Sequence, residues 1–210
     1  MYKNVIFDID GTLLDTHDAA LLALQKTLWE EYQIKQSLKD LEFSFSGTAQ
    51  DVFDKYHIPP EQQLHCAESV VKNAFTFTDE IKPFAGITAT LEQLRNWKIP
   101  LVVVTSEDQR EVDSVLMKTT IGQYFQHFIT ADQVQAPKPG AEPTLAALQQ
   151  IQAKASETLY IGDSKNDVGS AHNAQVDFGL AQWGANPELE FPEAEHIFSK
   201  PEEILAFIAH

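Results

Sequence analysis

Cysteine and long apolar runs are both scarce in this sequence of 210 residues. The single cysteine, Cys66, has no partner for a disulfide within the chain, and no charged segment leading into an apolar one opens the sequence, so we expect a cytoplasmic protein. No apolar stretch approaches the roughly 20 residues that a membrane-spanning helix needs. We therefore expect no membrane partner.

Basic residues are scarce as well. The chain has 15 Lys and Arg residues against 31 Asp and Glu residues, which gives a formal net charge of -16. Such a field repels polyanions, and counterion release cannot drive binding to DNA or RNA, so nucleic acid is not an expected partner. A small anionic substrate stays open, because a bound metal ion and a few local cations can reverse the potential inside a pocket.

Hydrophobic residues make up 43% of the sequence, enough for one large core or for a core with a small inserted subdomain. An apolar run at residues 5–7 predicts a first strand, residues 16–80 have helical patterns only, and short apolar strands then alternate with helices. Alternation of this kind indicates a parallel sheet covered on both faces. The sequence predicts an α/β fold, with a Rossmann-like parallel sheet core at 1–15 and 81–210 and an inserted α-helical cap subdomain at 16–80.

Polar residues follow the predicted strands, where ligands of open α/β sheets bind. They are Asp8 and Asp10, Thr105 and Ser106, Lys138 between two prolines, and Asp163 and Asp167 in the stretch GDSKND. Four separate loops thus bring acids, hydroxyls and one lysine to one edge of the sheet.

Carboxylates gathered at such an edge need a counter-charge. Residues two apart on a strand share a face, so Asp8 and Asp10 are expected to lie close together, with Asp163 adding a third negative charge. Mg²⁺, which prefers oxygen ligands and binds phosphate, resolves the repulsion. An aspartate can then act as nucleophile through an aspartyl-phosphate, while Thr105 and Lys138 hold phosphate oxygens.

These motifs resemble those of the haloacid dehalogenase superfamily of hydrolases, close to its phosphoglycolate phosphatase-like branch with a helical cap. The segment Asp8–Thr12 matches the first motif, Thr105 the second, Lys138-Pro139 the third and Gly162–Asp167 the fourth. The match runs over nearly the whole chain in the right order. Relatives often carry a neutral or basic residue at the position of Glu107, so this sequence departs from the pattern there.

The resemblance implies a role for each matched residue. Asp8 would be the nucleophile and a Mg²⁺ ligand, and Asp10 the general acid and base, also binding the metal through its main-chain carbonyl. Thr105 would bind the phosphoryl group, with Ser106 beside it, and Lys138 would steady the phosphate and the charge on Asp8. The remaining implied roles are Mg²⁺ binding by Asp163 and Asp167 and contact with the leaving group by Gly47 and Thr48 of a cap loop.

We therefore expect a Mg²⁺-dependent phosphatase that acts on a small phosphorylated metabolite as a monomer. A phosphomutase of the beta-phosphoglucomutase type remains an alternative, since it would use the same aspartyl-phosphate. So does a non-catalytic phosphate-binding regulatory module that keeps the fold. Haloacid dehalogenation is disfavoured, because it would leave Asp10, Asp163 and Asp167 without a role.

Overall fold

The computed structural model describes residues 1–46 and 48–209. The chain divides into two compact units: a helical unit, Thr16–Lys82, and a core unit made of Met1–Asp15 and Pro83–His210. None of the helices in the described ranges is long and apolar enough to cross a membrane.

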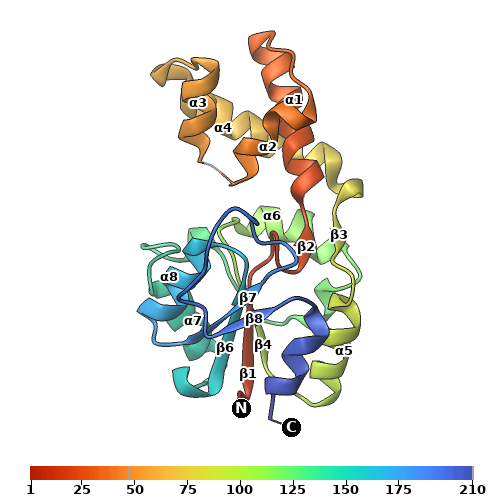
Figure 1. Ribbon diagram of the computed structural model, residues 1–210, viewed down its shortest axis with the longest axis vertical. Helices are drawn as coiled ribbons and strands as arrows, with labels where there is room; N and C mark the ends of the chain where they lie inside the picture. The colour runs from red at the N-terminus through yellow and green to blue at the C-terminus, as the bar shows by residue number, and fades with distance from the viewer. Residues whose placement is uncertain (47, 210) are drawn as a thin grey trace. The chain divides into compact units, whose positions relative to one another are not determined.

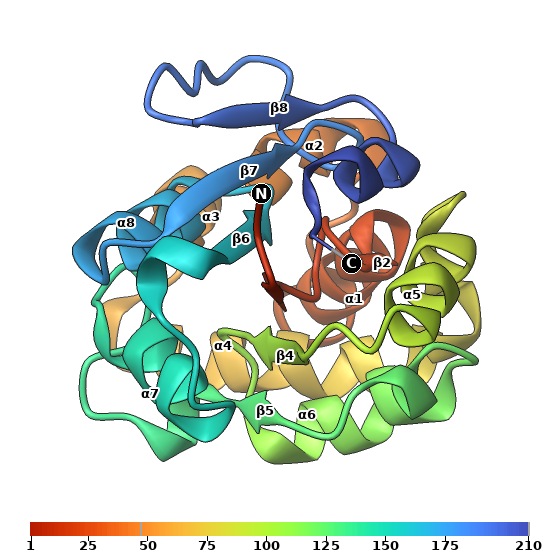
Figure 2. The same cartoon turned by 90° about the horizontal axis from the view of Figure 1, so that it is seen from below.

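The core unit is built on one sheet of six strands in the order β5-β4-β1-β6-β7-β8, with every neighbouring pair parallel (Figure 2). The strands are β1 (Asn4–Phe7), β4 (Leu101–Val104), β5 (Phe128–Ile129), β6 (Thr158–Gly162), β7 (Asp177–Ala181) and β8 (His196–Phe198). The chain moves outward from β1 to one side of the sheet and later resumes on its other side. The order is that of a doubly wound sheet, whose ligands bind where the direction of winding reverses.

The register of the central strands aligns the loops that follow them. Phe7 at the end of β1 lies opposite Val103 of β4 and Ile161 of β6. The three strands therefore end at nearly the same level. The polar residues after them share one edge of the sheet.

Helices cover both faces of this sheet (Figure 2). Helices α7 (Glu142–Gln150) and α8 (Lys165–Asn173) lie on one face, and α5 (Ile87–Asn96) lies on the other beside the terminal 3-10 helix η6 (Pro201–Phe207). The central strands β1, β4 and β6 are entirely buried, as expected for a sheet with two covered faces. The predicted α/β fold with a parallel sheet is confirmed.

The helical unit contains α1 (His17–Tyr32), α2 (Leu38–Ser46), α3 (Ala49–Tyr56), α4 (Pro60–Ala74) and the 3-10 helix η1 (Phe75–Glu80), labelled in part in Figure 1. Its core is apolar, and Cys66 is buried in it. Thr48 caps α3 through a reciprocal capping box with Asp51, as its sequence predicts. Two short strands, β2 (Leu14–Asp15) and β3 (Lys82–Pro83), pair with each other where the chain leaves and re-enters the core unit.

One local expectation is wrong. Strand β1 ends at Phe7, so Asp8 and Asp10 are not side by side on a strand; Gly11, with φ at +71°, turns the chain there. Helix α6 (Gln109–Ser114) is followed by a short 3-10 helix, η2 (Leu116–Lys118). The terminal segment forms the 3-10 helix η6.

Candidate active site

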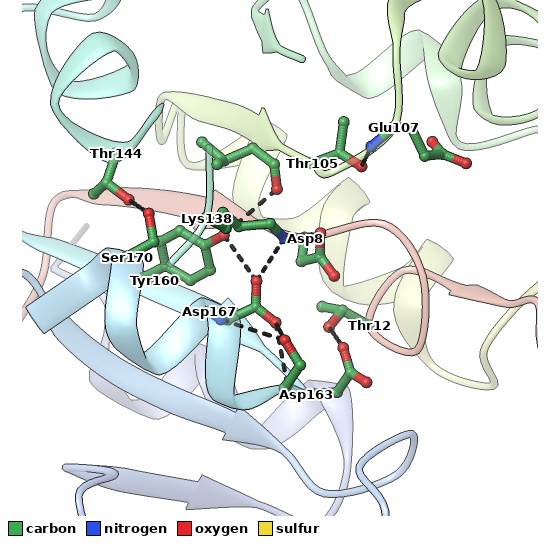
Figure 3. Close-up of polar contacts among 12 residues, drawn as sticks. Asp8, Thr12, Thr105, Glu107, Lys138, Thr144, Tyr160, Asp163, Asp167 and Ser170 are labelled. Atoms are coloured by element: carbon green, nitrogen blue, oxygen red, sulfur yellow. Dashed lines mark hydrogen bonds and ion pairs between the residues drawn. The ribbon is translucent and has the colours of Figure 1, made fainter. Parts of the chain in front are cut away.

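A buried lysine joins two carboxylates at the carboxyl edge of the core sheet (Figure 3). The Lys138 Nζ lies 2.7 Å from Asp8 Oδ1 and 2.7 Å from Asp167 Oδ1. All three side chains are less than a tenth exposed. Charges so removed from water are tolerated only when they are paired and hydrogen-bonded, which is the arrangement found here.

Asp167 is fixed from two further directions. Its Oδ2 accepts hydrogen bonds from the hydroxyl and the backbone N–H of Ser164, the N-cap of α8. Its Oδ1 accepts a hydrogen bond from the Tyr160 hydroxyl at 3.0 Å. The carboxylate is therefore held rigidly against Lys138.

Asp163 completes a cluster of carboxylates. Asp8, Asp163 and Asp167 each offer an oxygen, and these oxygens lie within 4.8 Å of one another. Thr12 donates a hydrogen bond to Asp163 Oδ1 at 3.1 Å. A Cβ on Gly11 would lie 2.3 Å from Asp163 Oδ2, so only glycine permits this close approach. Asp10 is close enough to add to the repulsion on Asp8, and its role as a metal ligand through the main chain remains a prediction.

The electrostatics of the cluster fit a divalent cation. Burial and repulsion by Asp167 raise the pKa of Asp8 to about 7, although Lys138 acts in the opposite direction. Burial and the same neighbour raise the pKa of Asp163 well above its usual range. A hard cation with oxygen ligands would offset this repulsion, and carboxylates are the side chains with which Mg²⁺ is usually held.

Lys138 stays charged in this environment. Burial alone would lower its pKa, but Asp167 and Asp8 outweigh that effect and raise the pKa well above its usual value. Lys138 is thus a buried cation of the site, although it lies in a loop between two prolines.

Thr105 follows β4 and is buried. Its backbone N–H donates to the Ile129 carbonyl at 3.0 Å, and its hydroxyl oxygen accepts a hydrogen bond from the Glu107 backbone N–H at 3.1 Å. Ser106 is exposed. The structure thus brings Thr105 to the same edge as Asp8, whereas a contact of Ser106 with substrate remains a prediction.

Glu107 has an unusual environment. Its Oε2 is buried and has no hydrogen-bond partner in the described ranges. Burial, followed by repulsion from Asp10, Glu111 and Asp8, raises the pKa of Glu107 to about 10. The side chain is therefore a neutral carboxylic acid at neutral pH.

The two cap residues expected to meet a substrate are not placed at a site. Gly47 lies outside the described residues. Thr48 is exposed, and its hydroxyl bonds to Asp51 at 2.7 Å within the cap of α3. Their role in substrate contact remains a prediction.

Four residues that support the site were not identified from the sequence: Thr12, Tyr160, Ser164 and Trp183. The spacing of Ser164 and Asp167 has capping-box form and could have been recognised. Trp183 donates from Nε1 to the Thr12 carbonyl at 2.9 Å, a contact between positions 171 residues apart that no local pattern reveals. The Tyr160 hydroxyl likewise reaches Asp167 only through the fold.

A doubly wound parallel sheet with aspartates and a lysine at its carboxyl edge defines an α/β enzyme of the Rossmann-like class. Residues 5–181 match the family described as haloacid dehalogenase-like hydrolase, and the chain belongs to this family. Together with the relatives described next, this identifies it as a phosphatase of that family.

The relatives are similar over most or nearly all of their length. The "Putative pyrophosphatase PpaX" of Clostridium perfringens (strain 13 / Type A) is 31% identical, with 99% of this chain and 98% of the relative covered. The pyrophosphatase PpaX of Oceanobacillus iheyensis is 29% identical, with 86% and 84% covered. A crystal structure named "putative phosphoglycolate phosphatase" from Lactobacillus plantarum is 30% identical, has a TM-score of 0.87 and covers 99% of this chain and 100% of its own.

Proposed function

We propose that this phosphatase is Mg²⁺-dependent and hydrolyses a small phosphomonoester through an aspartyl-phosphate on Asp8. The observation that supports the proposal best is the buried pair of Asp8 and Lys138, 2.7 Å apart, within the cluster that Asp163 and Asp167 complete. We further propose that the protein acts as a monomer in the cytoplasm.

In the first step Asp8 forms a bond from a carboxylate oxygen to phosphorus while the bond from phosphorus to the leaving oxygen breaks. Asp10 gives its proton to that oxygen. In the second step Asp10 takes a proton from water as the water oxygen attacks phosphorus, which releases phosphate and restores Asp8. Asp10 thus carries out both proton transfers, giving a proton in the first step and taking one in the second.

The other residues stabilise charge and geometry. Lys138 and Thr105 hold phosphoryl oxygens, and Tyr160 and Ser164 position Lys138 by fixing Asp167. Asp8, Asp163 and Asp167, with the main-chain carbonyl of Asp10, would hold Mg²⁺. When bound, the ion neutralises the charge that develops on the transferred phosphoryl group.

The names of the relatives support two candidate classes of substrate. Similarity to the Lactobacillus plantarum structure supports a phosphoglycolate-like monoester, which we take as the primary proposal. Similarity to the PpaX proteins over 99% of the chain supports pyrophosphate as a second candidate. Both present the same terminal phosphate to the core unit.

The test is phosphate release from an aryl phosphate, phosphoglycolate, sugar phosphates, nucleotides and pyrophosphate, each with Mg²⁺ and with chelator. Wild-type protein should cleave one class far faster than the rest, and only with Mg²⁺. Asp8→Asn should lower turnover at least about 1,000-fold, because it removes the nucleophile's charge while keeping its shape. Asp113→Asn, a matched change at an exposed position, should keep wild-type turnover.

Two outcomes would contradict the proposal. Cleavage in the presence of chelator would exclude the metal, and wild-type turnover by Asp8→Asn would exclude the nucleophile. A phosphomutase would instead keep the phosphate in the organic fraction. If no substrate in the panel loses phosphate, the non-catalytic binding module becomes the better interpretation.

A further inference from the structure

A second cavity lies at the opposite edge of the core sheet from Asp8. Its volume is about 410 Å³, within the range of pockets for small ligands. The lining residues that matter here are Arg95, Lys98, Gln123, Tyr124, Gln126 and His127. Lys98 lies just before β4 and His127 just before β5, so the cavity is at the amino ends of these strands, the edge from which Figure 2 is drawn.

The charge of this region is opposite to that of the molecule. The residues that line the cavity include two cations, Arg95 and Lys98, and no Asp or Glu. The whole chain has 31 acidic residues against 15 basic ones. The cavity therefore has a basic lining in a chain that is acidic overall.

The cations of the cavity are not neutralised within the protein. In the described ranges, neither Arg95 nor Lys98 forms an ion pair with a carboxylate, although five other Lys, Arg and His residues of the core unit do. Arg95 sits in the last turn of α5, where a cation also stabilises the helix end. That effect accounts for a cation at position 95. It does not account for the cation at Lys98, which lies beyond the helix, or for the cavity that both residues line.

The groups are arranged for an anion. The guanidinium of Arg95 stacks on the Tyr124 ring, 4.5 Å from its centroid, which restricts its motion. His127 Nδ1 lies 3.2 Å from Gln150 Nε2, and when it accepts that hydrogen bond the other ring nitrogen carries a proton that it can donate. The amides of Gln123 and Gln126 add neutral donors beside the two cations.

The acidic site does not cancel this potential. The four residues of β4 span about 13 Å from the cavity to the active-site edge. At the far edge, Lys138 pairs with both Asp8 and Asp167, which offsets part of the negative charge of that cluster. Bound phosphate would therefore experience mainly the local cations.

We propose that this cavity is a second ligand site, which binds a small phosphorylated molecule apart from the catalytic edge. Arg95 would contact two phosphate oxygens through its planar fork, and Lys98 would supply a point charge. Tyr124 offers a flat apolar surface for the organic part of the ligand. Occupancy requires neither Mg²⁺ nor Asp8.

The experiment is an NMR titration of the ¹⁵N-labelled full-length protein with inorganic phosphate and with AMP, in the presence of chelator. Resonances of residues 95–101 and 122–127 should shift with saturation, and AMP should bind more tightly than phosphate. The double variant Arg95→Gln, Lys98→Gln should weaken binding at least about 10-fold. Gln126→Glu, which adds a carboxylate to the cavity, should weaken it as well.

Lys35→Gln combined with Lys39→Gln, which removes the same two positive charges from exposed positions of the helical unit, should leave the affinity unchanged. The double variant should keep wild-type phosphatase activity in the absence of added ligand, so failure here is distinguishable from failure of the proposed catalytic function. The proposal is overturned if the shifts do not saturate, are confined to the loops that carry Asp8 and Thr105, or keep the same affinity in the double variant.

Discussion

At the scale of single residues, Lys138 compensates the buried negative charges at the catalytic edge of the sheet. It is the cation paired with both Asp8 and Asp167, and it is almost completely buried. Lys138→Ala should abolish measurable turnover and lower the free energy of unfolding by about 3–5 kcal/mol, because it leaves two buried carboxylates without a partner. Urea denaturation and phosphate release measure the two effects.

The matched control is Lys165→Ala. Lys165 pairs with Glu193 at 3.1 Å, but both side chains are at least two-fifths exposed, so its loss should cost less than about 1 kcal/mol. Equal destabilisation by the two variants would show that burial does not set the importance of Lys138.

Glu107 provides a prediction about pH. Its pKa is about 10 in the folded protein, because of burial and of repulsion by Asp10, and about 4.3 in an unfolded chain. The folded state thus keeps a proton that the unfolded state has released, so stability falls as pH rises from the lower value toward the higher one. Glu107→Gln imitates the protonated form and should therefore stabilise the protein by about 1–3 kcal/mol at pH 8.5.

The increase in the free energy of unfolding should be smaller at pH 5.5 than at pH 8.5. Urea denaturation at the two pH values measures it. Glu188→Gln, at an exposed position, removes the same charge and should have no comparable effect. If Glu107→Gln stabilises the protein equally at both pH values, protonation of the Glu107 carboxyl group is not the cause of the stabilisation.

At the scale of elements, a turn after β7 packs closely against the loop that carries Asp10. A Cβ on Gly184 would lie 1.8 Å from the backbone oxygen of Gly11, and the neighbouring Trp183 donates a hydrogen bond to the Thr12 carbonyl. Gly184→Ala must push backbone against backbone, so we expect a turnover loss of at least about 10-fold and a melting temperature lower by several degrees. Thermal melts and steady-state kinetics test this.

Trp183→Phe separates the hydrogen bond from the close approach. It keeps a ring in place and should cost about 0.5–1.5 kcal/mol, with a smaller loss of turnover than Gly184→Ala. A larger loss from Trp183→Phe would mean that the indole, and not the glycine, holds the loop.

Elements also show where prediction from sequence succeeds. Continuous apolar runs such as Leu101–Val104 are confirmed as buried strands, because only a sheet covered on both faces accommodates them. Strand ends are less certain: β1 stops at Phe7, so the expected pairing of Asp8 and Asp10 on a strand is wrong. The contacts of Tyr160 and Trp183 with the site depend on tertiary packing and leave no signal in local sequence.

At the scale of the whole molecule, the net charge of -16 attracts cations in general, so a specific metal site must be distinguished from screening. A ligand that binds only the folded state stabilises it by about 2.7 kcal/mol at 100 times its Kd. For a protein of this size that corresponds to a rise in melting temperature of about 5–11 °C. We expect such a rise with Mg²⁺, measured by calorimetry against chelator.

The control for this prediction uses the division of the chain into two units. The proposed metal ligands Asp8, Asp163 and Asp167 all belong to the core unit, so if the two units melt separately, only the transition of the core unit should move with Mg²⁺. General screening would also raise the melting temperature of the helical unit, and NaCl of equal ionic strength would produce the same rise as Mg²⁺. Asp163→Asn should remove the specific shift, because it takes a charged ligand out of the cluster. A Mg²⁺ shift that survives this change would place the ion elsewhere on the acidic surface.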